Sequence, residues 1–192
     1  MAYDKLRAAV DQHFDAIRQG LEDLTAIPSV SAPGFDAANV RASADFVAGL
    51  LKDAGFPEVR LLESEGAHPA VFAHYPAPAG APTVLLYAHH DVQPPGDERE
   101  WTSPPFEPVE RGGRVFGRGV ADDKSGVLMH VGAMIAHEGQ PPVGVKVIIE
   151  GEEEIGSLHL EDFIHEYEYC LLYTSDAAGR STLCRSRWSP YH

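Results

Sequence analysis

Cysteine is nearly absent from this sequence. Cys170 and Cys184 lie near the carboxyl terminus, so residues 1–169 contain no cysteine at all. That part of the chain therefore has no thiol for disulfides, for thiolate catalysis or for a cysteine zinc site. A metal ion bound there would need histidine, aspartate and glutamate as its ligands.

Positive charge is also scarce, and long apolar runs are missing. Lys and Arg number 15 against 29 Asp and Glu, which gives a net charge of -14. Nucleic acids and anionic membrane surfaces would repel such a chain. The sequence contains no run of about 18 apolar residues, which is the length needed to span a bilayer. Acidic residues stand near the N-terminus, where a signal peptide would be apolar. The sequence therefore predicts a cytoplasmic protein with neither nucleic-acid nor membrane partners.

What the sequence does contain is a regular hydrophobic pattern. Apolar residues at helical or strand spacing predict helices over 5–24, 40–54 and about 125–137, and strands over 58–63, 70–75, 83–91, 114–117 and 143–150. The strand at 83–91 is apolar on both faces, which predicts a place inside a covered sheet. The pattern is typical of an α/β sandwich whose central sheet is mostly parallel or mixed and is flanked by helices.

A first polar cluster, YAHHDVQP, stands at the end of a predicted strand, where open α/β sheets place their sites. On an extended chain His89 and Asp91 point to the same side, whereas His90 points away. The Asp91 carboxylate could accept one ring N–H of His89 and leave the other nitrogen for a metal. Taken alone, this pattern is more typical of a local hydrogen bond.

Two further clusters follow, GRGVADDKSG and VIIEGEEEIGS. The two aspartates could be helix N-caps, and the glutamates a solvated acidic turn. Together, however, the three clusters offer imidazole, aspartate and glutamate donors that suit zinc, with carboxylates to spare. Zinc lowers the pKa of bound water to about 7, and a free carboxylate nearby could take its proton. The combination predicts a metal-dependent hydrolase.

These residues resemble the dizinc exopeptidases and deacylases, a family that includes carnosinase-type dipeptidases, aminoacylase, acetylornithine deacetylase and succinyl-diaminopimelate desuccinylase. The matching strings are LLYAHHDVQP, WTSPPFEPVERGGRVFGRGVADDKSG and IIEGEEEIGS. The likeness spans about Leu21 to Phe163. The strings DVQP, PFEP and EGEEEIGS are most similar to the dipeptidase branch.

The resemblance implies a site with two zinc ions, with cobalt or manganese as alternatives. By this likeness His89 would bind one ion, Asp122 would bridge the two and Glu154 would bind the other. Asp91 would orient His89, and Glu153 would be the general base that activates water. These roles come from the resemblance and not from spacing alone.

The likeness also implies details of the backbone and of the ligand set. The peptide bond between Asp122 and Asp123 would be cis, which is rare outside proline. Ala88 and His90 stand where relatives usually have Gly and Tyr, and neither would bind metal. Asp176 falls near the place of a further acidic ligand of the family.

The function implied is hydrolysis of the peptide bond of dipeptides or short peptides by a full-length parent. An N-acyl amino-acid deacylase with the same zinc site is an alternative. The parent would be a homodimer formed through an inserted domain, which this chain lacks together with a late histidine ligand. A third hypothesis is that the chain is a truncated, catalytically inactive metal-binding fragment.

The carboxyl-terminal residues differ from the rest in composition. They contain both cysteines and three arginines against one aspartate. CLLYTS and CRSRWSPYH can be back-translated into DNA that resembles the transposase end and the flow-cell adapter of sequencing libraries. We therefore expect residues 1–169 to be the N-terminal part of a zinc peptidase catalytic domain, and 170–192 to be a non-native, adapter-derived tail.

Overall fold

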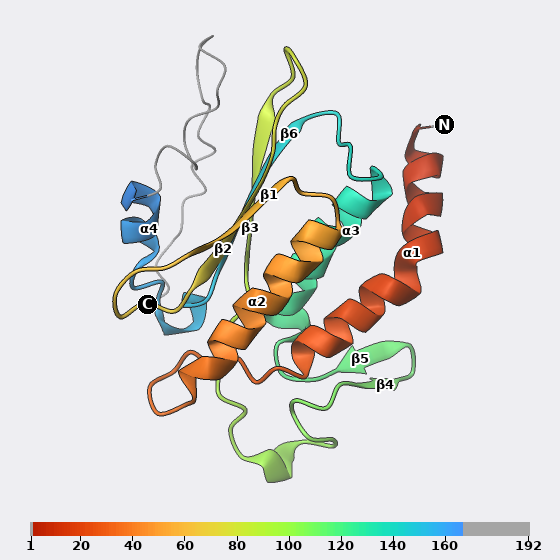
Figure 1. Ribbon diagram of the computed structural model, residues 1–192. Helices are drawn as coiled ribbons and strands as arrows, with labels where there is room; N and C mark the ends of the chain where they lie inside the picture. Colours follow the sequence, from red (N-terminus) through yellow and green to blue (C-terminus); the bar gives the residue numbers. More distant parts are fainter. Residues whose placement is uncertain (1, 167–192) are drawn as a thin grey trace, which may run out of the picture.

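The computed structural model describes residues 2–166, and the expected tail at 170–192 lies outside them (Figure 1). The helices are α1 (Ala2–Thr25), α2 (Ala37–Asp53), α3 (Ser125–Ala136) and α4 (Leu160–Glu166), with short helical turns at Glu98–Glu100, Val120–Lys124 and Glu153–Ile155. The strands are β1 (Glu58–Leu62), β2 (Ala70–Tyr75), β3 (Thr83–His89), β4 (Val109–Arg111), β5 (Arg114–Phe116) and β6 (Gly144–Glu150). Among these helices, none has both the length and the apolar character needed to cross a membrane.

The main sheet has the strand order β1-β2-β6-β3. β2 pairs with β1 and with β6 in the antiparallel sense, and β3 pairs with β6 in the parallel sense. The sheet is therefore mixed, as the alternation of strands and helices predicts. The parallel register sets His89 opposite Glu150, so both strands end at the same edge of the sheet.

Helices cover both faces of this sheet, as an α/β sandwich requires. Alternate residues of β2 and β6, such as Val71 and Val147, belong to the main core together with side chains of α2 and α3. The residues between them, Phe72 and Ile148, pack with Phe163 of α4 on the other face. Burial of a side chain of this size contributes about 1.5–3 kcal/mol. In Figure 1, α4 lies on the opposite side of the sheet from α2.

The helices begin and end close to their predicted places. α2 starts at residue 37, three residues before the prediction, because the Asp36 carboxylate accepts a hydrogen bond from the Ala38 N–H at 2.9 Å and caps the helix. It ends before Gly55, whose φ of 100° is easy only for glycine. Where α1 and α3 pack together, Gly20 and Gly132 face the side chains of Leu128 and Ile17.

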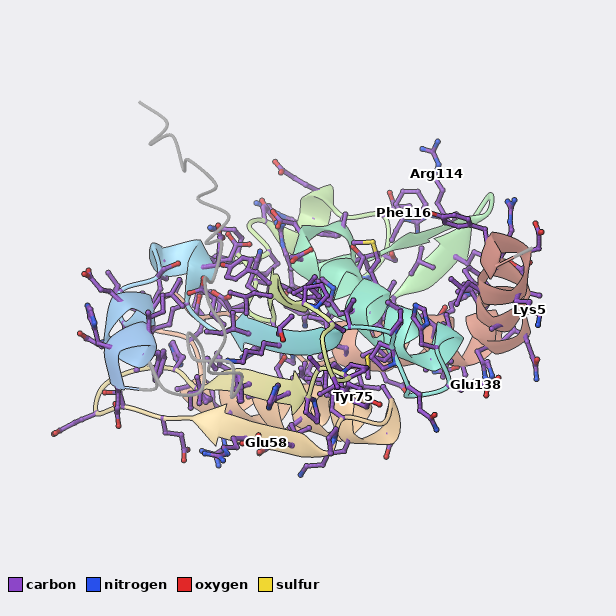
Figure 2. All side chains as sticks on the ribbon, turned by 90° about the horizontal axis from the view of Figure 1, so that it is seen from above. Lys5, Glu58, Tyr75, Arg114, Phe116 and Glu138 are labelled. Atoms are coloured by element: carbon purple, nitrogen blue, oxygen red, sulfur yellow. The ribbon has the colours of Figure 1, made fainter. Side chains whose placement is uncertain are left out.

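The hairpin β4–β5 forms a separate two-stranded sheet beside α1. An ion pair between Arg18 and Glu110 joins the helix to the hairpin. Figure 2 shows Arg114 and Phe116 of the hairpin on the opposite side of the molecule from Glu58 of β1. β5 confirms the strand predicted at 114–117, whereas β4 lies in a segment for which no strand was predicted.

The prediction that residues 83–91 form a covered strand is wrong for most of β3. This strand stands at an edge of the sheet among the described strands, and Val84, Leu85 and Tyr87 are 41%, 54% and 36% exposed. An apolar pattern shows that the side chains of a strand are suited to contact other apolar side chains. It does not determine which strands lie beside it.

Candidate metal centre

Three chain segments meet where β3 and β6 end. His89 is the last residue of β3, Glu154 lies in the turn after β6, and Asp122 lies in the turn before α3. One ligand atom from each of these side chains lies within 4.8 Å of the other two. The fold therefore brings together residues from all three polar clusters of the sequence.

His89 is held by Asp91 on one side and faces Asp122 on the other. Its Nδ1 lies 3.1 Å from the main-chain oxygen of Asp91 and 3.4 Å from its Oδ1, while Nε2 lies 3.1 Å from Oδ1 of Asp122. Burial alone would lower the pKa of His89, but the hydrogen bond with Asp91 and the nearby carboxylates raise it to about 9. With Nδ1 donating to Asp91, Nε2 is the nitrogen left for a ligand.

Asp91 does more than orient one histidine. It is fully buried, and its carboxylate accepts hydrogen bonds from the Ser31 hydroxyl at 2.6 Å and from the main-chain N–H groups of Glu153 at 3.2 Å and Glu154 at 3.1 Å. Burial alone would raise the pKa of Asp91, but the hydrogen bonds from His89, Ser31 and Glu154 lower it. A single carboxylate thus fixes the end of β3 against the glutamate turn.

The two aspartates of the second cluster take different places. Their peptide bond is cis, as the family resemblance implies. The Asp122 side chain is 80% exposed and faces His89, whereas the Asp123 carboxylate lies against Gly126. A Cβ at Gly126 would be 2.3 Å from Oδ1 of Asp123, so any larger residue there would displace this carboxylate. No side-chain cap is formed at the start of α3, so the N-cap interpretation is not borne out.

Glu153 and Glu154 face the site. Oε2 of Glu153 lies 3.8 Å from Nε2 of His89. Burial raises the pKa of Glu153, and the neighbouring carboxylates add to this while His89 opposes it. Glu154 is held by Gln93, whose side-chain amide donates to its Oε2 at 2.8 Å and to its main-chain oxygen at 3.1 Å.

The other two glutamates of the run are buried anchors, so a solvated acidic turn is the wrong interpretation for them. Glu150 accepts hydrogen bonds from the hydroxyls of Tyr87 and Ser157, and burial raises its pKa. Glu152 pairs with His159 at 2.9 Å and accepts from a main-chain N–H at 2.8 Å. The acidic run therefore divides into two carboxylates that hold the turn and two that face the site.

His90 is directed away from the site, as expected for a strand. Its ring is fully buried, and its Nε2 lies 3.0 Å from the main-chain oxygen of Pro69. Burial lowers the pKa of His90 to about 4. It takes no part in the cluster formed by His89, Asp122 and Glu154.

The donor set fits a divalent cation of the zinc type. It offers one imidazole nitrogen and two carboxylates, which are ordinary ligands of zinc. Two ligands of one tetrahedral ion, each about 2.0–2.1 Å from it, are roughly 3.3 Å apart. The distance of 3.1 Å between Nε2 of His89 and Oδ1 of Asp122 is close to that value.

A cavity of about 650 Å³ lies elsewhere, between the loop before β4 and the hairpin. Its lining includes Trp101, Phe116 and Arg118, and none of the three clustered residues. The guanidinium of Arg118 stacks over the Trp101 ring at 5.3 Å. We place the candidate chemistry at the residue cluster rather than in this cavity, because the cavity brings together no comparable set of donors.

Comparison with known proteins agrees with the geometry. Residues 85–177 match the model of peptidase family M20/M25/M40. The Cys-Gly metallodipeptidase of Schizosaccharomyces pombe is 35% identical over 176 residues, which cover 85% of this chain and 37% of that protein. A structure of human carnosine dipeptidase 1 superposes with a TM-score of 0.79 at 29% identity, covering 90% of this chain and 39% of that one.

This chain belongs to peptidase family M20/M25/M40. Membership implies that it binds divalent metal ions. Another relative is the succinyl-diaminopimelate desuccinylase of a Bradyrhizobium strain, 35% identical over 143 residues that cover 71% of this chain and 35% of that protein. The chain thus spans well under half the length of these M20 relatives.

Some contributors to this M20 site could not be found by sequence reasoning. Ser31 and Gln93 hold Asp91 and Glu154, but no role was predicted for either, although Gln93 belongs to the YAHHDVQP cluster. Lys124 adjoins the aspartates and is fully buried, although lysine usually signals exposure. Burial lowers the pKa of Lys124 to about 7, while the charge of Asp91 opposes that shift.

Proposed function

We propose that His89, Asp122 and Glu154 hold two zinc ions, and that this domain serves hydrolysis of the peptide bond of dipeptides or short peptides. The observation that carries the proposal is the convergence of their ligand atoms within 4.8 Å. The dipeptidases among the M20 relatives support peptide substrates.

The residues have separable tasks. Bound zinc would supply a Lewis acid and lower the pKa of water. Glu153 lies 3.8 Å from His89 and outside the cluster of three ligand atoms, so its carboxylate would be free to accept the proton of the attacking water and return it to the leaving amine. Burial raises the pKa of Glu153 above that of an ordinary glutamate, which makes its carboxylate a stronger base.

Asp91 would support this chemistry by holding three of the residues in place. Its carboxylate contacts Nδ1 of His89 and accepts hydrogen bonds from the main-chain N–H groups of Glu153 and Glu154. These bonds fix the backbone from which the two glutamate side chains extend. One buried anion thus positions a ligand from β3 and two acidic residues from the turn after β6. We assign Asp91 a positioning role.

A metal titration tests the proposed centre directly. The chain, with Cys170 and Cys184 replaced by serine so that thiols do not compete, should bind zinc in a calorimetric titration. His89→Ala should lose this binding, because it removes the nitrogen donor. The matched control Glu58→Gln, on β1 and outside the site, should bind as the parent does. Absence of zinc binding by the folded parent would contradict the proposal.

Hydrolysis of Cys-Gly tests the role of Glu153. Glu153→Gln should keep zinc and lose about 100-fold or more of the turnover, since a general base typically contributes that much. Turnover equal to that of the parent would remove Glu153 from the role. A parent that binds zinc but hydrolyses nothing would favour the inactive-fragment hypothesis.

An N-acyl amino-acid deacylase is the second candidate, because a desuccinylase is also among the relatives. The same zinc site could cleave the amide of an acylated amino acid. Comparing kcat/KM for Cys-Gly with that for N-succinyl-diaminopimelate separates the two. A higher value for the succinyl compound would favour the deacylase.

A further inference from the structure

Lys124 follows the two aspartates directly, and the chemistry above does not use it. Its side chain is fully buried, and its Nζ donates hydrogen bonds to the main-chain oxygens of Leu24 and Ile27, both at 2.8 Å. Lysine is almost never fully buried unless its ammonium is paired. Here the partners are backbone carbonyls at the end of α1.

These carbonyls are well suited to an ammonium. α1 ends at Thr25, so the Leu24 carbonyl belongs to the last turn, where main-chain oxygens lack helical partners. The same end of the helix carries the negative pole of its dipole, which favours a cation. Each oxygen also accepts one main-chain hydrogen bond, Leu24 from the Ile27 N–H at 3.2 Å and Ile27 from the Ser29 N–H at 2.9 Å. The ammonium of Lys124 therefore adds a second, charged donor to both oxygens and joins α1 to the segment that precedes α3.

Lys124 also closes the turn that carries Asp122. Its main-chain N–H donates to the Gly119 carbonyl at 3.0 Å, and a Cβ at Gly119 would lie 3.4 Å from Cδ of Lys124. Gly119 itself packs so tightly on Val92 that such a Cβ would be 2.3 Å from Cγ1 of that valine. The turn is thus fixed at one end against the loop after β3 and at the other end on α1.

The Asp122 side chain has little else to locate it. It is 80% exposed, and within residues 2–166 its hydrogen-bonding contact is with His89. Its position must therefore follow from the backbone of the turn. Loss of the Lys124 ammonium would remove the two hydrogen bonds that join the turn to the end of α1, and would free that end of the turn to move.

We propose that Lys124 is a positioning residue for the candidate metal centre: it holds the Gly119–Asp123 turn on the end of α1 and so sets the separation of Asp122 from His89. The role rests on the proposed function, since it concerns the same metal ligands. It differs from a general contribution to stability because it acts on the geometry of one ligand.

Zinc affinity of folded variants tests the proposal, again with Cys170 and Cys184 replaced by serine. Lys124→Met keeps the length of the side chain and removes the ammonium, and Leu62→Ala is the matched control because it opens the core on the α4 side. Thermal unfolding identifies a temperature at which all proteins are folded. At that temperature Lys124→Met should bind zinc at least about tenfold more weakly than the parent, as loss of a residue that supports a ligand does.

The control should lose thermal stability and keep the parental affinity. The visible spectrum of the cobalt-loaded protein gives a second readout, since a displaced Asp122 should change the bands of Lys124→Met but not those of Leu62→Ala. Parental affinity and an unchanged spectrum in folded Lys124→Met would overturn the proposal. A parent that binds no metal would instead remove the metal centre itself, and this role with it.

A measurement on the protein with Lys124 intact decides the matter if Lys124→Met does not fold. Zinc added to the isotopically labelled chain should shift the carbonyl ¹³C resonances of Leu24 and Ile27. The reason is that Lys124, which donates a hydrogen bond to each carbonyl, directly follows the turn that carries Asp122. Shifts at His89 and Asp122 with none at these two carbonyls would show that the end of α1 is not coupled to the site, and would overturn the proposal.

Discussion

His89 and His90 are neighbours in the sequence with opposite surroundings. His89 faces carboxylates that raise its pKa to about 9, whereas His90 is enclosed by the fold and has a pKa lowered to about 4. The alternation of side chains along a strand separates them. Of these two histidines, His89 therefore belongs to the candidate metal centre and His90 to the buried interior.

The buried His90 makes stability depend on pH. Its ordinary pKa is 6.5, so the unfolded chain gains a proton below that pH while the folded chain stays neutral until about pH 4. The free energy of unfolding should fall as the pH drops from 6.5 towards 4, by about 3 kcal/mol from this residue. Urea unfolding at several pH values measures the change.

His90→Gln is the control for this pH dependence, since an amide can still donate to the Pro69 carbonyl but does not titrate. The parent should lose more stability than this variant between pH 6.5 and 4. Equal losses in the two proteins would show that His90 does not cause the effect.

At the residue scale, the sequence predicted the members of the cluster and the contact of Asp91 with His89, but not the other residues that hold the site. His89, Asp122 and Glu154 belong to motifs that resemble a family, so they could be named in advance. Lys124 could not be predicted as a buried residue, because its environment depends on α1, which precedes it by about a hundred residues. Long-range partners of this kind leave no local pattern.

At the element scale, two glycines of the helices have opposite requirements. Gly126 lies in the first turn of α3 against the Asp123 carboxylate, and a Cβ there would be 2.3 Å from an oxygen. Gly49 lies inside α2 with nothing within 4 Å of the corresponding Cβ. Replacement of the first glycine would displace the Asp123 carboxylate, whereas the second glycine is replaceable.

Substitution of each glycine by alanine should therefore change stability in opposite directions. Gly126→Ala should lower the free energy of unfolding by about 1–3 kcal/mol, as overpacking does. Gly49→Ala should raise it by about 0.5–1 kcal/mol, because alanine favours a helix more than glycine does. Chemical denaturation measures both, and a loss of stability in Gly49→Ala would contradict the account of α2.

The predicted helices and strands mostly agree with the structure because their signals are local. The periodicity of α1 and the apolar run of β6 each depend on a few neighbouring residues. The surroundings of β3 were predicted wrongly, because the number of strands beside it is a property of the whole sheet. Similarly, β5 was predicted but β4 was not, because β4 is short and partly polar and depends on its pairing with β5.

At the scale of the whole molecule, the edge formed by β3 is the most exposed apolar feature of the sheet in residues 2–166. Leu85 is 54% exposed, and Val84 beside it is 41% exposed. An unpaired apolar edge is a place where chains associate with one another. The same edge faces away from β6, which pairs with β3 on its other side.

Leu85→Lys should reduce association of the chain at high concentration, because a charged side chain on an edge strand opposes edge-to-edge pairing. Stability should change by less than about 0.5 kcal/mol, since the leucine is largely in solvent. Light scattering over a concentration series measures association. The matched variant Leu86→Lys should instead destabilise the fold, because Leu86 packs against the main core. Unchanged scattering in Leu85→Lys would contradict the role of this edge.

The parallel pairing of β3 with β6 also has a consequence for the order of folding. His89 and Glu150 become neighbours only after the crossover through the Asp122 turn and α3 has closed. Closure of so long a loop is slow, because its entropy is lost before the distant contacts form. The ligands therefore meet late, so a bound metal ion is expected to prolong the lifetime of the native state without hastening its formation.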